Sequence, residues 1–145
     1  MLLSDDYFMR EALKEAEKAF DADEVPVGAV VVCDGRIIAR AHNLTERLTD
    51  VTAHAEMQAI TAAANHLGGK YLDQCTIYVT LEPCMMCAGA IAWAQCDRLV
   101  FGADDIKRGY RLYASNILHP KTKINSGVAA EASTQLLKDF FRRKR

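Results

Sequence analysis

Long apolar runs are missing from this sequence. No stretch approaches the roughly 18 consecutive apolar residues that a membrane-spanning helix needs. The N-terminus, Met1-Leu2-Leu3 followed by Asp5-Asp6, also lacks the basic residues and the apolar core of a secretion signal. We therefore expect a cytoplasmic protein that has no membrane as a partner.

A dominant charge of one sign is absent as well. The chain has 18 Lys and Arg residues and 19 Asp and Glu residues, so its formal net charge is -1. A protein with so little net charge does not attract polyanions over its whole surface. Any contact with nucleic acid must therefore come from local patches of charge.

The five cysteines do not form the even, regularly spaced set of a disulfide framework. An odd number that includes one Cys-x-x-Cys pair favours a reducing compartment and metal binding over disulfides. The chain has 145 residues, half of them hydrophobic, which is the length and composition of one globular domain with a core. We expect a single domain over residues 1–145.

Hydrophobic periodicity and turn signals predict a chain that alternates between strands and helices. Strands over 25–33 and 36–42 should pair as an antiparallel hairpin, because Asp34-Gly35 between them is a strong turn signal. The later strands are separated by helices, which favours parallel pairing. The fold class is therefore α/β with a mixed sheet. The remaining predicted elements are helices over 4–21, 54–66, 83–93 and 128–141 and strands over 76–81, 98–102 and 123–125.

Single residues refine this outline. Pro83 suits the first turn of the third helix, where its missing N–H costs nothing. Gly28 has no side chain, so the first strand should let a ligand approach its backbone there. The apolar side of the second helix is expected to consist of Met57, Ile60, Ala64 and Leu67.

Two short motifs supply the residue types of a metal site. The first contains His54 and Glu56, and the second contains Cys84 and Cys87. One imidazole and two thiolates are three ligands for a tetrahedral zinc ion, which leaves the fourth position open for water. Zinc lowers the pKa of such a water from about 15.7 towards about 7. The carboxylate of Glu56 can then move protons without holding the metal.

Both motifs fall at predicted helix starts. Cys84 and Cys87 are three residues apart, so their sulfurs share one side of the first turn, where the helix dipole stabilises thiolates. His54 and Glu56 are two residues apart, or about 200° around a helix. Their side chains can converge only if the site lies beyond the helix end. The sequence therefore predicts two helix N-termini that face one ion.

A structural zinc site is the alternative interpretation of these motifs. It would need a fourth protein ligand, although none of the other cysteines and histidines repeats a ligand spacing. The candidates are Cys33, Cys75, Cys96, His42, His66 and His119. A further alternative is that the two motifs never meet. Glu56 argues against a non-catalytic zinc module that binds RNA, because such a module needs no general acid or base.

The order His-x-Glu and then Pro-Cys-x-x-Cys is similar to the signature of zinc-dependent nucleobase deaminases. The wider sequence resembles the bacterial tRNA-specific adenosine deaminases of the cytidine and deoxycytidylate deaminase superfamily. This resemblance implies a hydrolase of cyclic amidines that converts the wobble adenosine (A34) of a tRNA anticodon to inosine. The matching segments span nearly the whole chain and are 24–30, 42–43, 52–56, 78–90, 100–103 and 139–142.

The resemblance also implies a fold, a cofactor and partners. The fold would be cytidine-deaminase-like, with three α/β/α layers around a mixed five-stranded sheet. Each subunit would hold one zinc ion (Zn2+) through His54, Cys84 and Cys87, and Glu56 would be the catalytic residue. The partners would be a tRNA anticodon stem-loop and a second copy of the chain in a homodimer.

Substrate contacts follow from the same resemblance. Asn43 would hydrogen-bond the flipped nucleotide, and Asp105 would contact nucleotides beside it. The predicted substrate-binding residues are Val27, Asn43, Ala55 and Asp105. Each of the two polar residues has a plainer interpretation: an Asn that ends a strand at a turn, and one half of a solvated acidic pair.

Basic residues gather in two places despite the small net charge. The tail ends Arg142-Arg143-Lys144-Arg145, which is more positive charge than a helix dipole needs. We expect these cations and those of the 107–111 segment to contact phosphate groups. The predicted RNA-backbone residues are Lys107, Arg108, Arg111, Arg142, Arg143 and Lys144.

Two segments depart from the family pattern. Asp50-Val51-Thr52 stands where the family usually has Asp-Pro-Thr, and the segment 109–115 replaces a stretch of small residues, Gly-Ala-x-Gly-Ser. The second segment should lie near the substrate. A deaminase of free guanine, cytosine or a nucleoside, with the same zinc chemistry, is therefore the alternative activity.

Overall fold

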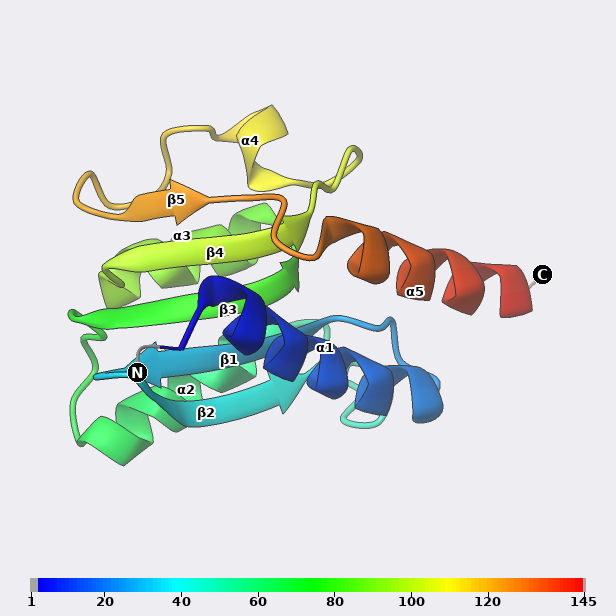
Figure 1. Cartoon of the computed structure of the whole chain (residues 1–145), viewed down its shortest axis with the longest axis horizontal. Helices are drawn as coiled ribbons and strands as arrows, with labels where there is room; N and C mark the ends of the chain where they lie inside the picture. The colour runs from blue at the N-terminus through cyan, green and yellow to red at the C-terminus, as the bar shows by residue number, and fades with distance from the viewer. Residues whose placement is uncertain (1–2, 145) are drawn as a thin grey trace.

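A five-stranded sheet with the strand order β2-β1-β3-β4-β5 organises the structure (Figure 1). The computed structural model describes residues 3–144. The strands are β1 (Gly28–Cys33), β2 (Arg36–His42), β3 (Cys75–Leu81), β4 (Arg98–Ala103) and β5 (Lys123–Asn125). The helices are α1 (Asp5–Asp21), α2 (Ala55–Leu67), α3 (Met85–Ala94), α4 (Tyr110–Tyr113) and α5 (Ala130–Arg143). Every helix within residues 3–144 is too short or too polar to cross a membrane.

The sheet is mixed, as the sequence predicts. β1 pairs antiparallel with β2 and with β3, whereas β3–β4 and β4–β5 are parallel. Asp34 and Gly35 join the hairpin with φ angles of 55° and 73°, the left-handed pair that favours Asp-Gly. The C-terminal ends of the parallel strands β3 and β4 lie at the same end of the sheet. Helix α3 and the segment that leads to α4 begin there.

The strands separate two apolar layers. Ala29 and Val31 of β1 belong to the core that α2 and α3 cover, whereas Val30 and Val32 pack with α1. This alternation follows from the two-residue period of a strand. Helices α1 and α5 therefore cover one face of the sheet and α2 and α3 cover the other (Figure 1), which gives the predicted three layers.

Gly28 lies where α1 touches the sheet. A Cβ at this position would lie 2.1 Å from the carbonyl oxygen of Ala12 and 2.4 Å from the backbone nitrogen of Ala16. The missing side chain therefore admits the backbone of a helix. The expectation that a ligand approaches Gly28 is wrong, because α1 occupies that space.

The buried side of α2 also differs from the prediction. Ala59 and Ala63 are fully buried, whereas Ile60 is half-buried and Leu67 is 43% exposed. Small alanines let the helix lie close to the sheet, which moves the larger apolar residues to the rim of the contact.

The predicted N-cap of α1 is confirmed. Ser4 accepts a hydrogen bond from the backbone N–H of Tyr7 at 3.1 Å, as an N-cap should.

Candidate metal centre and active site

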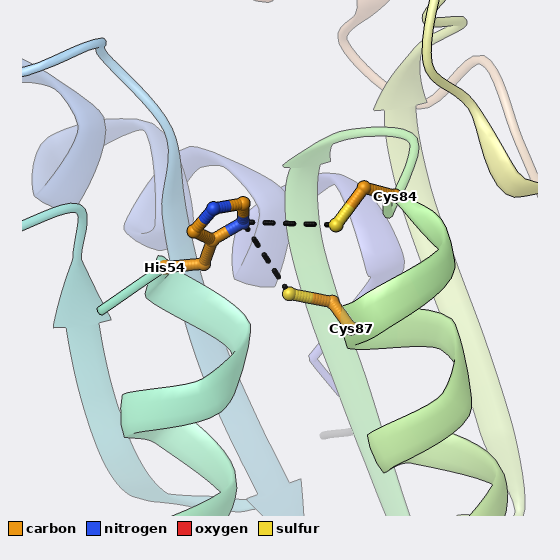
Figure 2. Close-up of side chains that lie close together, drawn as sticks. All are labelled: His54, Cys84 and Cys87. Carbon is orange, nitrogen blue, oxygen red and sulfur yellow. Dashed lines mark hydrogen bonds between the residues drawn. The ribbon is translucent and has the colours of Figure 1, made fainter. Parts of the chain in front are cut away.

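The two motifs meet at the N-termini of α2 and α3. His54 is the N-cap of α2 and Cys84 is the N-cap of α3, both with extended backbone. Neither side chain caps its own helix, so both reach past the helix ends towards each other (Figure 2). Pro83 therefore precedes the cap instead of occupying the first turn, and the helix begins at Met85. The predicted convergence of two helix N-termini is confirmed.

The three ligand atoms have the spacing of a zinc site. Nδ1 of His54 lies 3.7 Å from Sγ of Cys84 and 3.5 Å from Sγ of Cys87. Tetrahedral coordination, with Zn–N of about 2.0–2.1 Å and Zn–S of about 2.3 Å, separates nitrogen from sulfur by about 3.5 Å. The donor set and its spacing therefore fit zinc.

The group contains no fourth protein ligand within residues 3–144. Its ligand atoms lie within 4.8 Å of one another and come from His54, Cys84 and Cys87 alone. The other cysteines and histidines of the described chain do not join it. A set of three protein ligands is typical of a catalytic zinc site, whereas a structural site uses four.

The three side chains also influence one another's protonation. Hydrogen bonds from Cys87 and from His54 lower the pKa of Cys84 to about 4. The contact with Cys84, together with burial, raises the pKa of the Cys87 thiol, and hydrogen bonding to Cys84 raises the pKa of His54. One thiolate is thus favoured at neutral pH, and a bound dication favours deprotonation of the other.

Glu56 lies beside this group in the first turn of α2. Its side chain is only 4% exposed, and burial raises the pKa of its carboxyl to about 7. The neighbouring Cys84, His54 and Cys87 also influence the pKa of this carboxyl, so Glu56 lies next to the ligand atoms. A carboxyl whose pKa lies near neutrality can both accept and donate a proton, which is the requirement for a general acid and base.

Asn43 uses its side chain to hold the start of α2. Its Nδ2 donates to the carbonyl oxygen of Val25 at 3.0 Å, and its Oδ1 accepts from the backbone N–H of Ala55 at 2.8 Å. One Nδ2 hydrogen remains for a substrate. Sequence reasoning assigned Asn43 to the substrate and missed this second role in holding the helix that carries His54.

Val27 and Ala55 lie in the interior beside Asn43. The carbonyl oxygen of Val27 accepts from the backbone N–H of Asn43 at 3.2 Å, and the Val27 side chain is 6% exposed. Ala55 is fully buried. Substrate binding by these two residues stays a prediction.

Asp105 folds its own loop. Its Oδ1 accepts from the backbone N–H groups of Lys107 and Arg108 at 3.1 and 3.0 Å. This is the local pattern by which Asp stabilises a turn. Its predicted contact with nucleotides beside the target remains a prediction.

A buried carboxylate that the sequence analysis did not identify holds the loop that contains Asp105 in place. Glu82 is 4% exposed and accepts hydrogen bonds from the backbone N–H groups of Asp105 and Arg111, both at 3.1 Å. The guanidinium of Arg111 binds the same carboxylate from Nε at 3.2 Å and Nη2 at 3.1 Å. The sequence feature that could have indicated this structural role is an acidic residue directly after an apolar strand.

Four of the six predicted RNA-backbone residues already have carboxylate partners. Arg111 pairs with Glu82 and Asp104. Arg142 pairs with Asp139, and Arg143 and Lys144 both pair with Asp23. Within residues 3–144, the side chains of Lys107 and Arg108 form no ion pair. Arg145, the last residue of the predicted basic tail, lies outside the described residues.

The fold and the site together define a deaminase. The family model for MafB19-like deaminases matches residues 3–145 of the chain. A solved structure of the protein NE0047 in complex with 8-azaguanine is 23% identical to this chain with a TM-score of 0.89, and the match covers 98% of this chain and 86% of that one. At this identity the likeness shows the fold alone, which is the predicted α/β/α arrangement.

Relatives of higher sequence identity show which group of deaminases the chain belongs to. The tRNA-specific adenosine deaminase of Agrobacterium fabrum is 46% identical over 144 residues, which are 96% of this chain and 95% of the relative. That of Aquifex aeolicus is 45% identical over 145 residues, 97% of this chain and 95% of the relative. The chain therefore belongs to the MafB19-like deaminase family and, within it, to the tRNA-specific adenosine deaminases.

Two solved structures are also similar. One comes from a study of A-to-I editing by tRNA:A34 deaminases at the wobble position of transfer RNA. It is 46% identical with a TM-score of 0.84, and the match covers 90% of this chain and 99% of that one. The guanine deaminase of Bacillus subtilis is 39% identical with a TM-score of 0.68, covering 70% of this chain and 66% of that one.

Proposed function

We propose that this chain converts the wobble adenosine (A34) of a tRNA anticodon to inosine by zinc-dependent hydrolysis. The observation that carries the proposal is the His54, Cys84 and Cys87 group with the buried carboxyl of Glu56 beside it. Close identity along nearly the whole chain to proteins named for this activity supports the choice of substrate.

The chain's own residues divide the chemistry between them. His54, Cys84 and Cys87 would hold one zinc ion per subunit, which when bound supplies Lewis-acid activation of water at neutral pH. Glu56 accepts a proton from the attacking water. It delivers this proton to a ring nitrogen of the base, then takes the second proton of the added water and delivers it to the exocyclic amine. The amine leaves as ammonia, and the oxygen of the water stays on the base as its carbonyl oxygen.

A cleft beside the site offers a path for the tRNA. It has a volume of about 850 Å³ and lies between the 104–108 loop and α5. Its lining includes four cations, two carboxylates (Asp104 and Asp105) and apolar residues such as Leu137; the cations are Lys107, Arg108, Lys138 and Arg142. Cations beside apolar surface suit a nucleic acid strand, because phosphates and bases can be bound together. A tRNA substrate also supports a cytoplasmic location.

A homodimer is supported by α3. This helix is apolar on all sides, and a helix of that kind is normally covered on all sides. Its inner side packs on the sheet, whereas Trp93 is 83% exposed and Met85 is 48% exposed. A second copy of the chain over the outer side of α3 would cover both residues.

A free-base deaminase is the second candidate. The likeness to the guanine deaminase of Bacillus subtilis favours it, because the same zinc chemistry would act on either substrate. The decisive experiment incubates the zinc-loaded protein with an anticodon stem-loop that carries a wobble adenosine and, in parallel, with free guanine, cytosine and adenosine. Inosine in the stem-loop supports the first candidate. Ammonia from free guanine alone supports the second.

A further inference from the structure

A small hollow lies next to the metal centre. It has a volume of about 380 Å³ and is lined by Cys84, Met85, Met86, Arg108 and Tyr113. Because Cys84 belongs to both, whatever fills the hollow lies beside a base that reacts at the centre. Arg108 comes from the segment between β4 and α4, Tyr113 is the last residue of α4, and the other three come from the start of α3.

Tyr113 presents an open ring that is held at its far end. The side chain is 64% exposed, and its hydroxyl donates to the carbonyl oxygen of Lys107 at 2.7 Å. A ring that is exposed and already anchored loses little conformational freedom when a ligand stacks on it. Tyr113 is therefore positioned for a base to stack on its ring, whereas a tyrosine that served packing alone would be buried.

The loop beneath the ring is fixed at both ends by one buried carboxylate. Glu82 binds the backbone N–H groups of Asp105 and Arg111, and the guanidinium of Arg111 completes the contact. A Cβ at Gly109 would lie 2.4 Å from the Glu82 carboxylate, so the loop lies directly against it. This packing fixes the positions of Lys107 and Arg108, and hence the carbonyl oxygen to which Tyr113 is bound.

The chemistry of the hollow suits a nucleotide. Its lining offers an aromatic ring, two methionines and one guanidinium, and it includes no carboxylate. Among residues 3–144, the guanidinium of Arg108 has no acidic partner. Single-stranded RNA is recognised by stacking of bases on aromatic rings and by cations that bind the phosphates. A free base would use only part of such a surface.

We propose that Tyr113 stacks on a nucleobase that flanks the target adenosine in the tRNA anticodon and that Arg108 binds a phosphate beside that base. The proposal deepens the proposed function and depends on it. It makes Tyr113 a specificity-determining residue, which favours a polynucleotide over a free base, and it makes Glu82 and Arg111 positioning residues for the loop.

The test compares Tyr113→Ala, Tyr113→Phe and the control Tyr71→Ala, an exposed tyrosine on a remote loop. Stem-loop deamination is followed for KM and kcat, and stem-loop binding is followed by fluorescence anisotropy. Loss of one stacked base weakens binding roughly 5- to 150-fold. Tyr113→Ala should therefore raise KM and Kd by at least about fivefold with little change in kcat. Tyr71→Ala should stay near the wild type, and Tyr113→Phe, which keeps the ring but loses its hydrogen bond to Lys107, should lie between the wild type and Tyr113→Ala.

A second arm removes the proposed partner of the ring from the RNA. Stem-loops with an abasic site on either side of the wobble adenosine are compared for the wild type and Tyr113→Ala. If Tyr113 stacks on one of those bases, the two proteins should bind the corresponding abasic RNA equally. The same result is not expected of a residue that only stabilises the fold. Arg108→Ala, with Arg36→Ala as the control, should weaken binding and reduce its salt dependence.

The possible outcomes distinguish a failure of the proposed function from a failure of the proposed role of Tyr113. A wild-type protein that leaves the stem-loop unchanged overturns the proposed function. An active wild type with Tyr113→Ala within about twofold of it overturns the role of Tyr113 alone. A change of oligomeric state or of zinc content in Tyr113→Ala also overturns it, because the ring would then belong to a subunit contact or to the fold.

Discussion

Glu56 and Glu82 are both 4% exposed, and both lie at the end of the sheet where α2 and α3 begin. Their surroundings differ. Glu56 has sulfurs and an imidazole beside it, and burial raises its pKa to about 7. Burial alone would also raise the pKa of Glu82, but hydrogen bonds from the side chain and backbone of Arg111 and from the backbone of Asp105 outweigh it and lower that pKa. The partners of a buried carboxylate thus decide whether it moves protons or holds structure.

Replacement of Glu56 by Gln gives the largest expected effect on activity. The amide keeps the size of the side chain but cannot accept or deliver the proton, so kcat should fall by about 10²- to 10⁴-fold. Stem-loop deamination measures this, with zinc content and urea unfolding as checks on folding. The exposed Glu17→Gln variant is the control. A zinc-loaded Glu56→Gln protein of near-normal kcat would remove Glu56 from the mechanism.

Replacement of Glu82 by Gln should give the opposite pattern. The variant leaves the N–H groups of the loop and the guanidinium of Arg111 without their full partner, which should lower the free energy of unfolding by about 1–3 kcal/mol. KM for the stem-loop should rise more than kcat falls. Urea unfolding and steady-state kinetics measure both quantities. A loss of kcat as deep as that of Glu56→Gln, at full stability, would contradict the distinction between the two carboxylates.

A substitution at Gly109 tests the same contact from the loop side. The Cβ of Gly109→Ala would lie 2.4 Å from the Glu82 carboxylate, so loop and carboxylate must move apart. We expect a loss of stability of about 1–3 kcal/mol and a higher KM. Gly69→Ala is the matched control, because a Cβ there meets no atom within 4 Å. Equal unfolding curves for the two variants would show that the loop yields without cost.

Asp5 extends the comparison to a partly exposed carboxylate. Its oxygens accept from Arg98 at 2.8 Å and from the Tyr78 hydroxyl at 2.6 Å, and the hydrogen bond from Arg98 lowers its pKa. A lowered pKa adds stability above the unfolded-state pKa of about 3.9, and this stability is lost as the pH falls through the lower folded-state value. Asp5→Asn should therefore be less stable than the wild type at neutral pH, and the gap should close below about pH 3.9. Urea unfolding across that range checks the sign.

Tyr110 gives the smallest expected effect. Among the described residues its hydroxyl is buried without a hydrogen-bond partner. Tyr110→Phe should therefore leave the free energy of unfolding unchanged or raise it by up to about 1 kcal/mol. The control is Tyr78→Phe, which removes the hydroxyl bound to Asp5 and should lower stability by about 1 kcal/mol. Equal losses in both variants would mean that the Tyr110 hydroxyl has a partner in solution.

The parts of the fold and site that depend on local sequence were predictable. Asp34-Gly35 specifies its hairpin turn by backbone conformation, and the two metal motifs predict converging helix starts because their residue types serve one coordination geometry. The partners of the basic tail were not predictable, since Arg143 and Lys144 pair with Asp23, which is more than a hundred residues away in the sequence. The role of Glu82 was hidden for the same reason, because its partners belong to a loop that follows the next strand.

Two of the four groups that hold the 104–113 loop on Glu82 are backbone N–H groups, which almost every residue type offers. The loop can therefore change most of its side chains over evolution and still close on the same carboxylate, provided that Gly109 is kept small. The residues of the reaction must keep their types, whereas the segment that we propose to contact the substrate can change most of its side chains. On this proposal, a change of substrate would require exchange of only one short segment.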